Sequence, residues 1–189
     1  TVFLDNRGHG YTGLAADGVY TVAAMREDIR TLIESLELDR PTLIGHSMGG
    51  AVSASFAAMY PELIRGVILF DPPWIAEELV TPEKIREGFE SFRSDLSEFK
   101  ALSFADLVSV GKERNPNWVE EDYRAWAKAK QMATFEVLEI LPDLLTDWSK
   151  NAEKIRIPAM LMTGNPDLGA IVTPEIAAQV CSGKPNWTL

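Results

Sequence analysis

A serine stands in the middle of Gly45-His46-Ser47-Met48-Gly49, where its hydroxyl could act as a nucleophile. The preceding Pro41-Thr42-Leu43-Ile44 predicts a short buried strand, and the small residues that fill much of 49–58 predict a helix. Gly-x-Ser-x-Gly between a strand and a helix is the pattern of a nucleophile elbow. So tight a turn strains the backbone of the serine and requires small residues beside it. The N-terminus of the following helix presents free N–H groups, which can stabilise the oxyanion that forms when the serine attacks a carbonyl group. The sequence therefore predicts nucleophilic catalysis by Ser47.

The elements that must position this serine alternate between strands and helices. Strands are predicted at 1–4, 41–44, 66–70 and 157–163, with another beginning at 187, and helices at 22–36, 49–58 and 174–180. Thr21 and Thr173 precede two of these helices as N-cap candidates. The alternation predicts an α/β fold with a doubly wound, mostly parallel sheet. The site is then expected at the carboxyl ends of the strands.

The alternation stops between Pro72 and Lys154, where no strand pattern appears. We therefore expect 1–72 and 155–189 to form two parts of one core and 73–154 to form an all-helical cap, a candidate lid above Ser47. Aromatic residues recur there at helical spacing, and their simplest role is to hold the cap helices together. Trp74, just past a strand end and a Pro-Pro pair, is the residue best placed to line a substrate pocket.

The composition limits the classes of molecule that this protein is expected to bind. Eighteen basic and 28 acidic residues give a net charge of −10, which argues against binding to nucleic acid or to an anionic membrane surface. A single cysteine, Cys181, excludes an internal disulfide, and no apolar run approaches a membrane span. No signal-peptide pattern is present either, so we expect a cytoplasmic protein. The two histidines lack metal-ligand spacing and Gly8-x-Gly10 opens no helix, so no metal or other cofactor is expected.

Three motifs in one order carry a family resemblance. Asp5-Asn6-Arg7-Gly8-His9-Gly10 follows the first predicted strand, the serine motif follows the next, and Gly164-Asn165-Pro166-Asp167 follows a late one. With these motifs the chain resembles the α/β-hydrolase superfamily, in its serine-nucleophile branch with a helical cap, like a carboxylesterase or lipase. The dehalogenase and epoxide-hydrolase branches carry an aspartate where this chain has Ser47. The resemblance covers essentially all 189 residues.

The resemblance implies a catalytic triad in the chain order serine, acid, histidine. Ser47 would attack an acyl carbonyl to form an acyl-enzyme that water then clears. The N–H of Met48, the residue after the nucleophile, would donate to the oxyanion. Asp167 would orient the base and stabilise it when charged. Asp71, which also ends a strand on the same face, is the alternative acid.

The histidines depart from the family pattern. His9 and His46 are the two that the chain contains, and both precede Asp167. His46 is adjacent to the nucleophile and should point away from it, and the simplest role for His9 is to shape its own turn. In relatives the base lies beyond the position of Leu189. We therefore expect a sheet that is incomplete at both ends, an inactive 189-residue chain and an active full-length protein.

The sequence thus favours a serine hydrolase that acts on a small to medium-sized ester or related acyl compound. Hydrolytic cleavage of a C–C bond, or perhydrolysis, would use the same framework. A third alternative is a non-catalytic or receptor-like protein that keeps the pocket for ligand binding. A histidine missing from the full-length chain would favour this last alternative.

Overall fold

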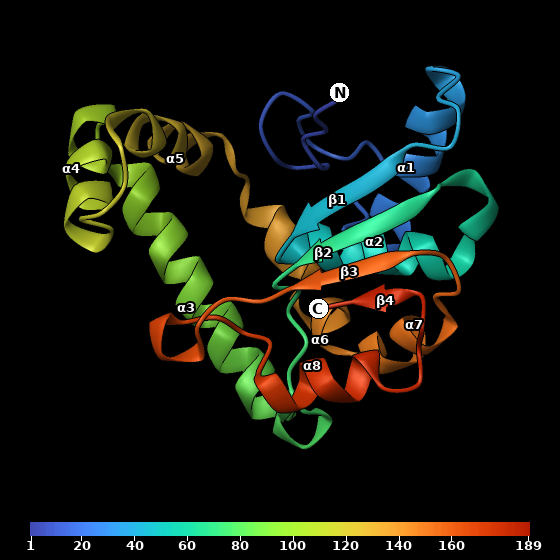
Figure 1. Ribbon diagram of the computed structural model, residues 1–189. Coiled ribbons are helices and arrows are strands. Elements are labelled where there is room, and N and C mark those ends of the chain that lie inside the picture. The colour runs from blue at the N-terminus through green and yellow to red at the C-terminus, as the bar shows by residue number, and fades with distance from the viewer. The chain divides into compact units, whose positions relative to one another are not determined.

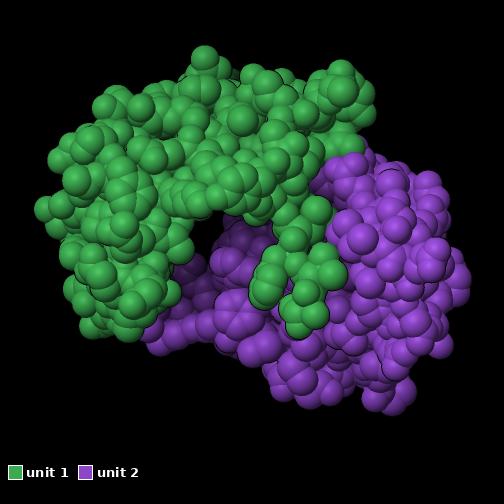
Figure 2. Space-filling model, turned by 90° about the horizontal axis from the view of Figure 1, so that it is seen from above, with its two compact units in different colours: residues 1–20, 85–139 green, residues 21–84, 140–189 purple.

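The computed structural model describes residues 1–189, which divide into two compact units (Figure 2). The first, here called the sheet unit, contains residues 21–84 and 140–189. The second, the helical unit, contains residues 1–20 and 85–139. The elbow motif lies in the sheet unit.

Four strands form a parallel sheet in the order β1-β2-β3-β4 (Figure 1). They are β1 Thr42–His46, β2 Gly66–Phe70, β3 Ala159–Met162 and β4 Trp187–Thr188. Leu43, Val67, Ala159 and Trp187 are aligned across the four strands. The parallel α/β sheet is confirmed.

Five α-helices belong to the sheet unit: α1 Val22–Ser35, α2 Met48–Met59, α6 Leu141–Leu145, α7 Trp148–Lys154 and α8 Pro174–Cys181. The Thr21 side chain accepts a hydrogen bond from the Ala24 N–H at 3.1 Å, so it caps α1 as predicted. Thr173 caps α8 in the same way, with the Ile176 N–H at 3.4 Å. Helices long and apolar enough to cross a bilayer are absent from residues 1–189.

Helix α2 lies against β1 and β2 and forms the centre of the core. Eight of its residues are glycine, alanine or serine, which lets its backbone approach the strands, and Phe56 is fully buried. Side chains alternate between the two faces of a strand, so Val67 and Leu69 enter this core while Ile44 and Phe70 are exposed. The second face of the sheet is therefore open along an apolar stripe.

A polar network joins α1 to the end of α2. Glu27 accepts hydrogen bonds from Arg30 at 2.8 Å and from the Tyr60 hydroxyl at 2.7 Å. These bonds lower the pKa of Glu27 to about 2. Arg26 donates to the hydroxyl of Ser55, a buried residue of α2, at 3.2 Å. The serine helix is thus attached to its neighbour by polar as well as apolar contacts.

The strand predicted at Thr1–Leu4 is wrong. These residues form neither strand nor helix, and Phe3 is 93% exposed. A β-prone run becomes a strand only where a second strand supplies hydrogen-bonding partners, and none pairs with it here. The local sequence is typical of a strand, but these residues have no neighbouring strand to pair with.

The helical unit contains most of α3 Pro82–Ala101 together with α4 Phe104–Arg114 and α5 Glu120–Met132. Phe99, Leu107 and Ala127 are buried at its centre, and the Trp126 ring packs edge-on against Phe99 with centroids 5.2 Å apart. Several of the aromatics thus hold these helices together. The unit includes only residues 85–139 of the predicted cap 73–154, because residues 73–84 and 140–154 belong to the sheet unit. That the helices act as a lid stays a prediction.

The N-terminal loop belongs to the helical unit and is fastened to it at Gly8. The Gly8 carbonyl accepts a hydrogen bond from the Thr134 N–H at 3.0 Å. Gly8 has φ +75°, and a Cβ there would lie 2.3 Å from Cγ1 of Val137. Only glycine fits this position, which explains Gly8 of the Asp5–Gly10 motif.

Candidate active site

Ser47 occupies the turn between β1 and α2 with φ 50° and ψ −119°, a region that residues with side chains rarely adopt. The backbone around it fixes this conformation. The Ser47 N–H donates to the Phe70 carbonyl at 2.9 Å, and the Ser47 carbonyl accepts from the Ala51 N–H at 3.1 Å. Strain of this kind costs on the order of 1–3 kcal/mol and persists only where surrounding structure enforces it. The predicted strand, turn and helix are present.

The close approach of β1 to α2 depends on Gly45 and Gly50. A Cβ on Gly45 would lie 2.1 Å from the Gly49 carbonyl oxygen, which no side chain movement could relieve. A Cβ on Gly50 would lie 3.1 Å from Cβ of Pro72. Gly49, by contrast, would present its Cβ to open space. The steric requirement predicted for the turn therefore falls on two of the three glycines.

This difference predicts opposite effects for two matched substitutions. Gly45→Ala drives a methyl group into backbone and is expected to lower the free energy of unfolding by about 3 kcal/mol or more. Gly49→Ala adds a methyl group at a helix position where it meets no other atom, and is expected to raise that free energy by up to about 1 kcal/mol. Urea denaturation followed by circular dichroism measures both. Equal losses in the two variants would contradict the close approach.

The first amides of α2 are available to an external acceptor. The N–H groups of a helix's first turn have no intrahelical partner, and the Ser47 side chain makes no capping bond to them. Met48, the residue after the serine, is the first residue of α2, so its N–H is one of these amides. The helix dipole adds positive potential at this end. The arrangement could stabilise an oxyanion formed on a carbonyl that Ser47 attacks.

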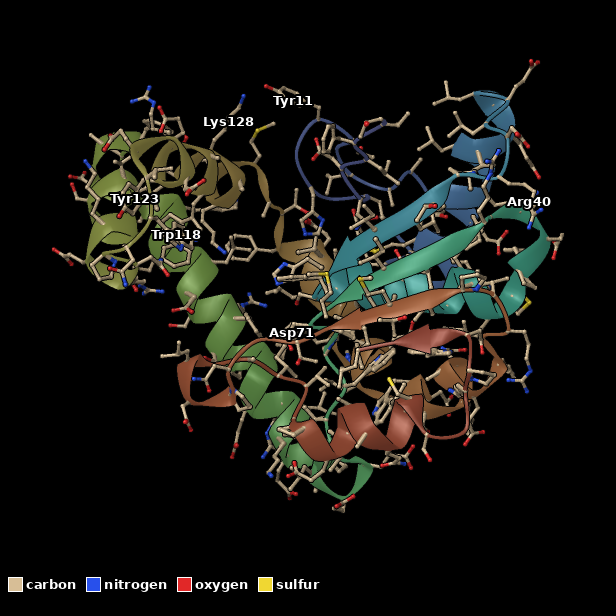
Figure 3. All side chains as sticks on the ribbon, viewed as in Figure 1. Tyr11, Arg40, Asp71, Trp118, Tyr123 and Lys128 are labelled. Atoms are coloured by element: carbon tan, nitrogen blue, oxygen red, sulfur yellow. The ribbon has the colours of Figure 1, made fainter.

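Asp71 directly follows β2 and fastens a distant loop (Figure 3). Its carboxylate accepts hydrogen bonds from the Ile171 N–H, at 2.9 and 3.1 Å to its two oxygens, and from the Val172 N–H at 3.0 Å. Its own N–H donates to the Met162 carbonyl at 2.8 Å. Asp71 has φ 42°, a strained value that these bonds hold in place. Asp71 thus ties the loop after β3 to the end of β2.

Asp167 lies in that loop, on the single 3-10 turn Pro166–Leu168. The turn is held by the Asn165 side chain, which accepts from the Asp167 N–H at 3.0 Å. Asp167 is exposed, and its carboxylate forms no hydrogen bond or ion pair within residues 1–189. One aspartate therefore fixes the loop while the other remains available to a further group.

The two histidines occupy different settings. The His46 ring packs against Phe70, with centroids 5.4 Å apart, and no hydrogen bond joins it to Ser47. His9 lies in the helical unit, with Nδ1 3.1 Å from the Arg7 carbonyl oxygen of its own turn. Each ring thus contacts a residue of its own unit, and it stays a prediction that neither histidine is the base for Ser47.

Trp74 is a core residue. Its side chain is 1% exposed and stacks on Trp148, with ring centroids 5.4 Å apart and an interplanar angle of 17°. The cavity beside it has a volume of about 10 Å³, enough for one water molecule. Because its ring is buried against Trp148, the structure does not support the prediction that Trp74 lines a substrate pocket. Trp148 lies more than 70 residues further along the chain, so the local sequence contains no sign of this contact.

A family model and two relatives show what this chain is similar to. A family model described as alpha/beta hydrolase fold matches residues 1–186. The 2-(acetamidomethylene)succinate hydrolase of Mesorhizobium japonicum is 38% identical over 211 residues, which cover 100% of this chain and 75% of that protein. A serine hydrolase-like protein of Danio rerio is 31% identical over 114 residues, which cover 60% of this chain but only 33% of that protein.

Solved structures show the same fold. An esterase from Exiguobacterium antarcticum matches with a TM-score of 0.72 at 21% identity, over 98% of this chain and 69% of that one. The structure of an E-2-(acetamidomethylene)succinate hydrolase matches with a TM-score of 0.69 at 20% identity, over 97% of this chain and 69% of that one. With a family model that spans nearly every residue, the chain belongs to the alpha/beta hydrolase family.

Proposed function

We propose that this protein is a serine hydrolase that cleaves a small to medium-sized ester or related acyl compound through an acyl-enzyme. The observation that carries the proposal is the backbone of Ser47, strained at φ 50° between β1 and the N-terminus of α2. A strained turn that lifts a hydroxyl to the start of a helix serves nucleophilic attack next to oxyanion donors. The hydrolase names of the relatives support the same class of reaction.

The reaction would proceed in two halves. The Ser47 Oγ attacks the acyl carbonyl and loses its proton to a base, while the Met48 N–H stabilises the oxyanion. The base returns that proton to the leaving group, and the acyl-enzyme forms. Water, deprotonated by the same base, then attacks the acyl-enzyme and releases the acid and Ser47. Asp167 would orient the base, and we propose that the base is a histidine outside residues 1–189.

A panel of p-nitrophenyl esters of rising acyl length, assayed on the full-length protein, tests this proposal. We expect turnover to be highest for short and medium acyl chains, with a burst of p-nitrophenol where release of the acyl group is slow. Matched p-nitroanilides should be included, because the relative from Mesorhizobium japonicum is named for an acetamido compound. Absence of turnover across the whole panel would favour ligand binding without catalysis.

A further inference from the structure

The helical unit contains a cavity of about 520 Å³, and all of the residues that line it belong to that unit. Pockets for small organic molecules in proteins have volumes of this order. Much of the wall is aromatic, from Phe92 and Phe99 on α3, Trp118 in the loop after α4, and Trp126 on α5. Such a wall suits a flat apolar body.

The loop that carries Trp118 is held in place. The Tyr123 hydroxyl donates to the Asn115 carbonyl at 2.8 Å, and the rings of Trp118 and Tyr123 lie 6.0 Å apart (Figure 3). Both Asn115 and Trp118 line the cavity. This side of the cavity is therefore a preformed part of the unit.

Three charged side chains line the cavity, and one of them forms no salt bridge. Asp95 lies 3.9 Å from Arg114, so these two charges compensate each other. The Lys130 ammonium makes no salt bridge and lies over two aromatic rings, 5.6 Å from the Phe99 centroid and 5.5 Å from that of Trp126. Burial lowers the pKa of Lys130, which reports the cost of charging a desolvated ammonium there.

The two cations also share one ring. The Arg114 guanidinium lies 4.9 Å from the Phe99 centroid, and its charge, like burial, lowers the pKa of Lys130. The attraction of Asp95 only partly offsets these effects. A negative charge brought into the cavity would relieve the repulsion and give Lys130 the partner it lacks.

We propose that this cavity binds a small organic carboxylate with an aromatic or apolar body, its carboxylate on Lys130 and its body against the aromatic wall. The charged wall groups, Asp95, Arg114 and Lys130, carry one net positive charge, which a monoanion neutralises. Lys130 is a specificity-determining residue in this assignment. The assignment does not depend on the reaction at Ser47 and can be tested without turnover.

Isothermal titration of the full-length protein with 3-phenylpropionate tests the proposal, with neutral 3-phenylpropanamide as the matched ligand. We expect the acid to bind at least 10-fold more tightly than the amide. Lys130→Met should lose that preference, whereas Lys130→Arg should keep it within a few-fold. Lys128→Met is the matched control, because Lys128 lies on the same helix but is exposed and contacts Tyr11 (Figure 3). It should bind as the wild type does.

A folding defect would not imitate this result. Lys130→Met replaces a desolvated charge by an apolar side chain of similar length, so its urea midpoint is expected to equal or exceed that of the wild type. The proposal is overturned if the acid and the amide bind equally or not at all. It is also overturned if Lys130→Met keeps full preference for the acid.

Discussion

Ser47→Ala is expected to reduce ester hydrolysis by the full-length protein by roughly 10³- to 10⁶-fold, the range found when a triad nucleophile is removed. An alanine cannot form the acyl-enzyme, so only the oxyanion donors and substrate binding would remain. The fold should survive, because alanine has the same backbone restrictions as serine and the Ser47 side chain makes no capping bond to α2. Initial rates on the best ester of the panel measure the loss.

Ser109→Ala serves as the matched control for this loss. Ser109 is an exposed helical serine whose hydroxyl donates to the Ala105 carbonyl at 3.2 Å. Its substitution should leave turnover unchanged. A fluorophosphonate probe should label the wild type and the control but not Ser47→Ala. Labelling of Ser47→Ala, or turnover undiminished in it, would exclude Ser47 as the nucleophile.

Local patterns predicted most of the sheet unit. The run Gly66-Val67-Ile68-Leu69-Phe70 became β2 with the same bounds, because a short stretch rich in β-branched and aromatic residues between turn signals favours a strand. The helix after Thr21 also formed, because its apolar spacing and its cap agree. Thr1–Leu4 failed on the same local evidence, since pairing depends on a second strand that local sequence does not specify.

Contacts between residues far apart in the chain could not be predicted from the sequence. Asp71 bonds to amides of Ile171 and Val172, 100 and 101 residues later, and no spacing rule connects such positions. Trp74 was predicted to line a pocket because its stacking partner Trp148 lies 74 residues later in the sequence. Lys130 lies in the stretch 73–154 that was predicted to be helical, but its place in a cavity depends on how three helices pack. The serine turn was predictable because all of its parts are adjacent in sequence.

The second large effect concerns the two aspartates, whose substitutions should separate catalysis from loop anchoring. Asp167→Asn is expected to lower turnover by roughly 10²- to 10⁴-fold, because an amide cannot stabilise a charged base as a carboxylate does. It should change the free energy of unfolding by less than about 0.5 kcal/mol, because Asp167 is exposed and its carboxylate holds no structural bond. Steady-state kinetics and urea denaturation of the same preparations measure both quantities.

Asp71→Asn should show the reverse pattern. In the variant, the side-chain amide nitrogen of the asparagine would face backbone N–H groups that donate to the carboxylate of the wild type. At least one of the N–H groups of Ile171 and Val172 would therefore lose its hydrogen-bond partner. We expect a loss of about 2–3 kcal/mol in the free energy of unfolding, the scale of charge-assisted hydrogen bonds, and faster proteolysis within 163–173. Asp39→Asn, at an exposed carboxylate paired with Arg65, is the control and should change neither quantity. If Asp71→Asn instead abolishes turnover with stability intact, while Asp167→Asn is nearly silent, Asp71 is the acid. The loop then serves to hold that carboxylate, rather than the carboxylate to hold the loop.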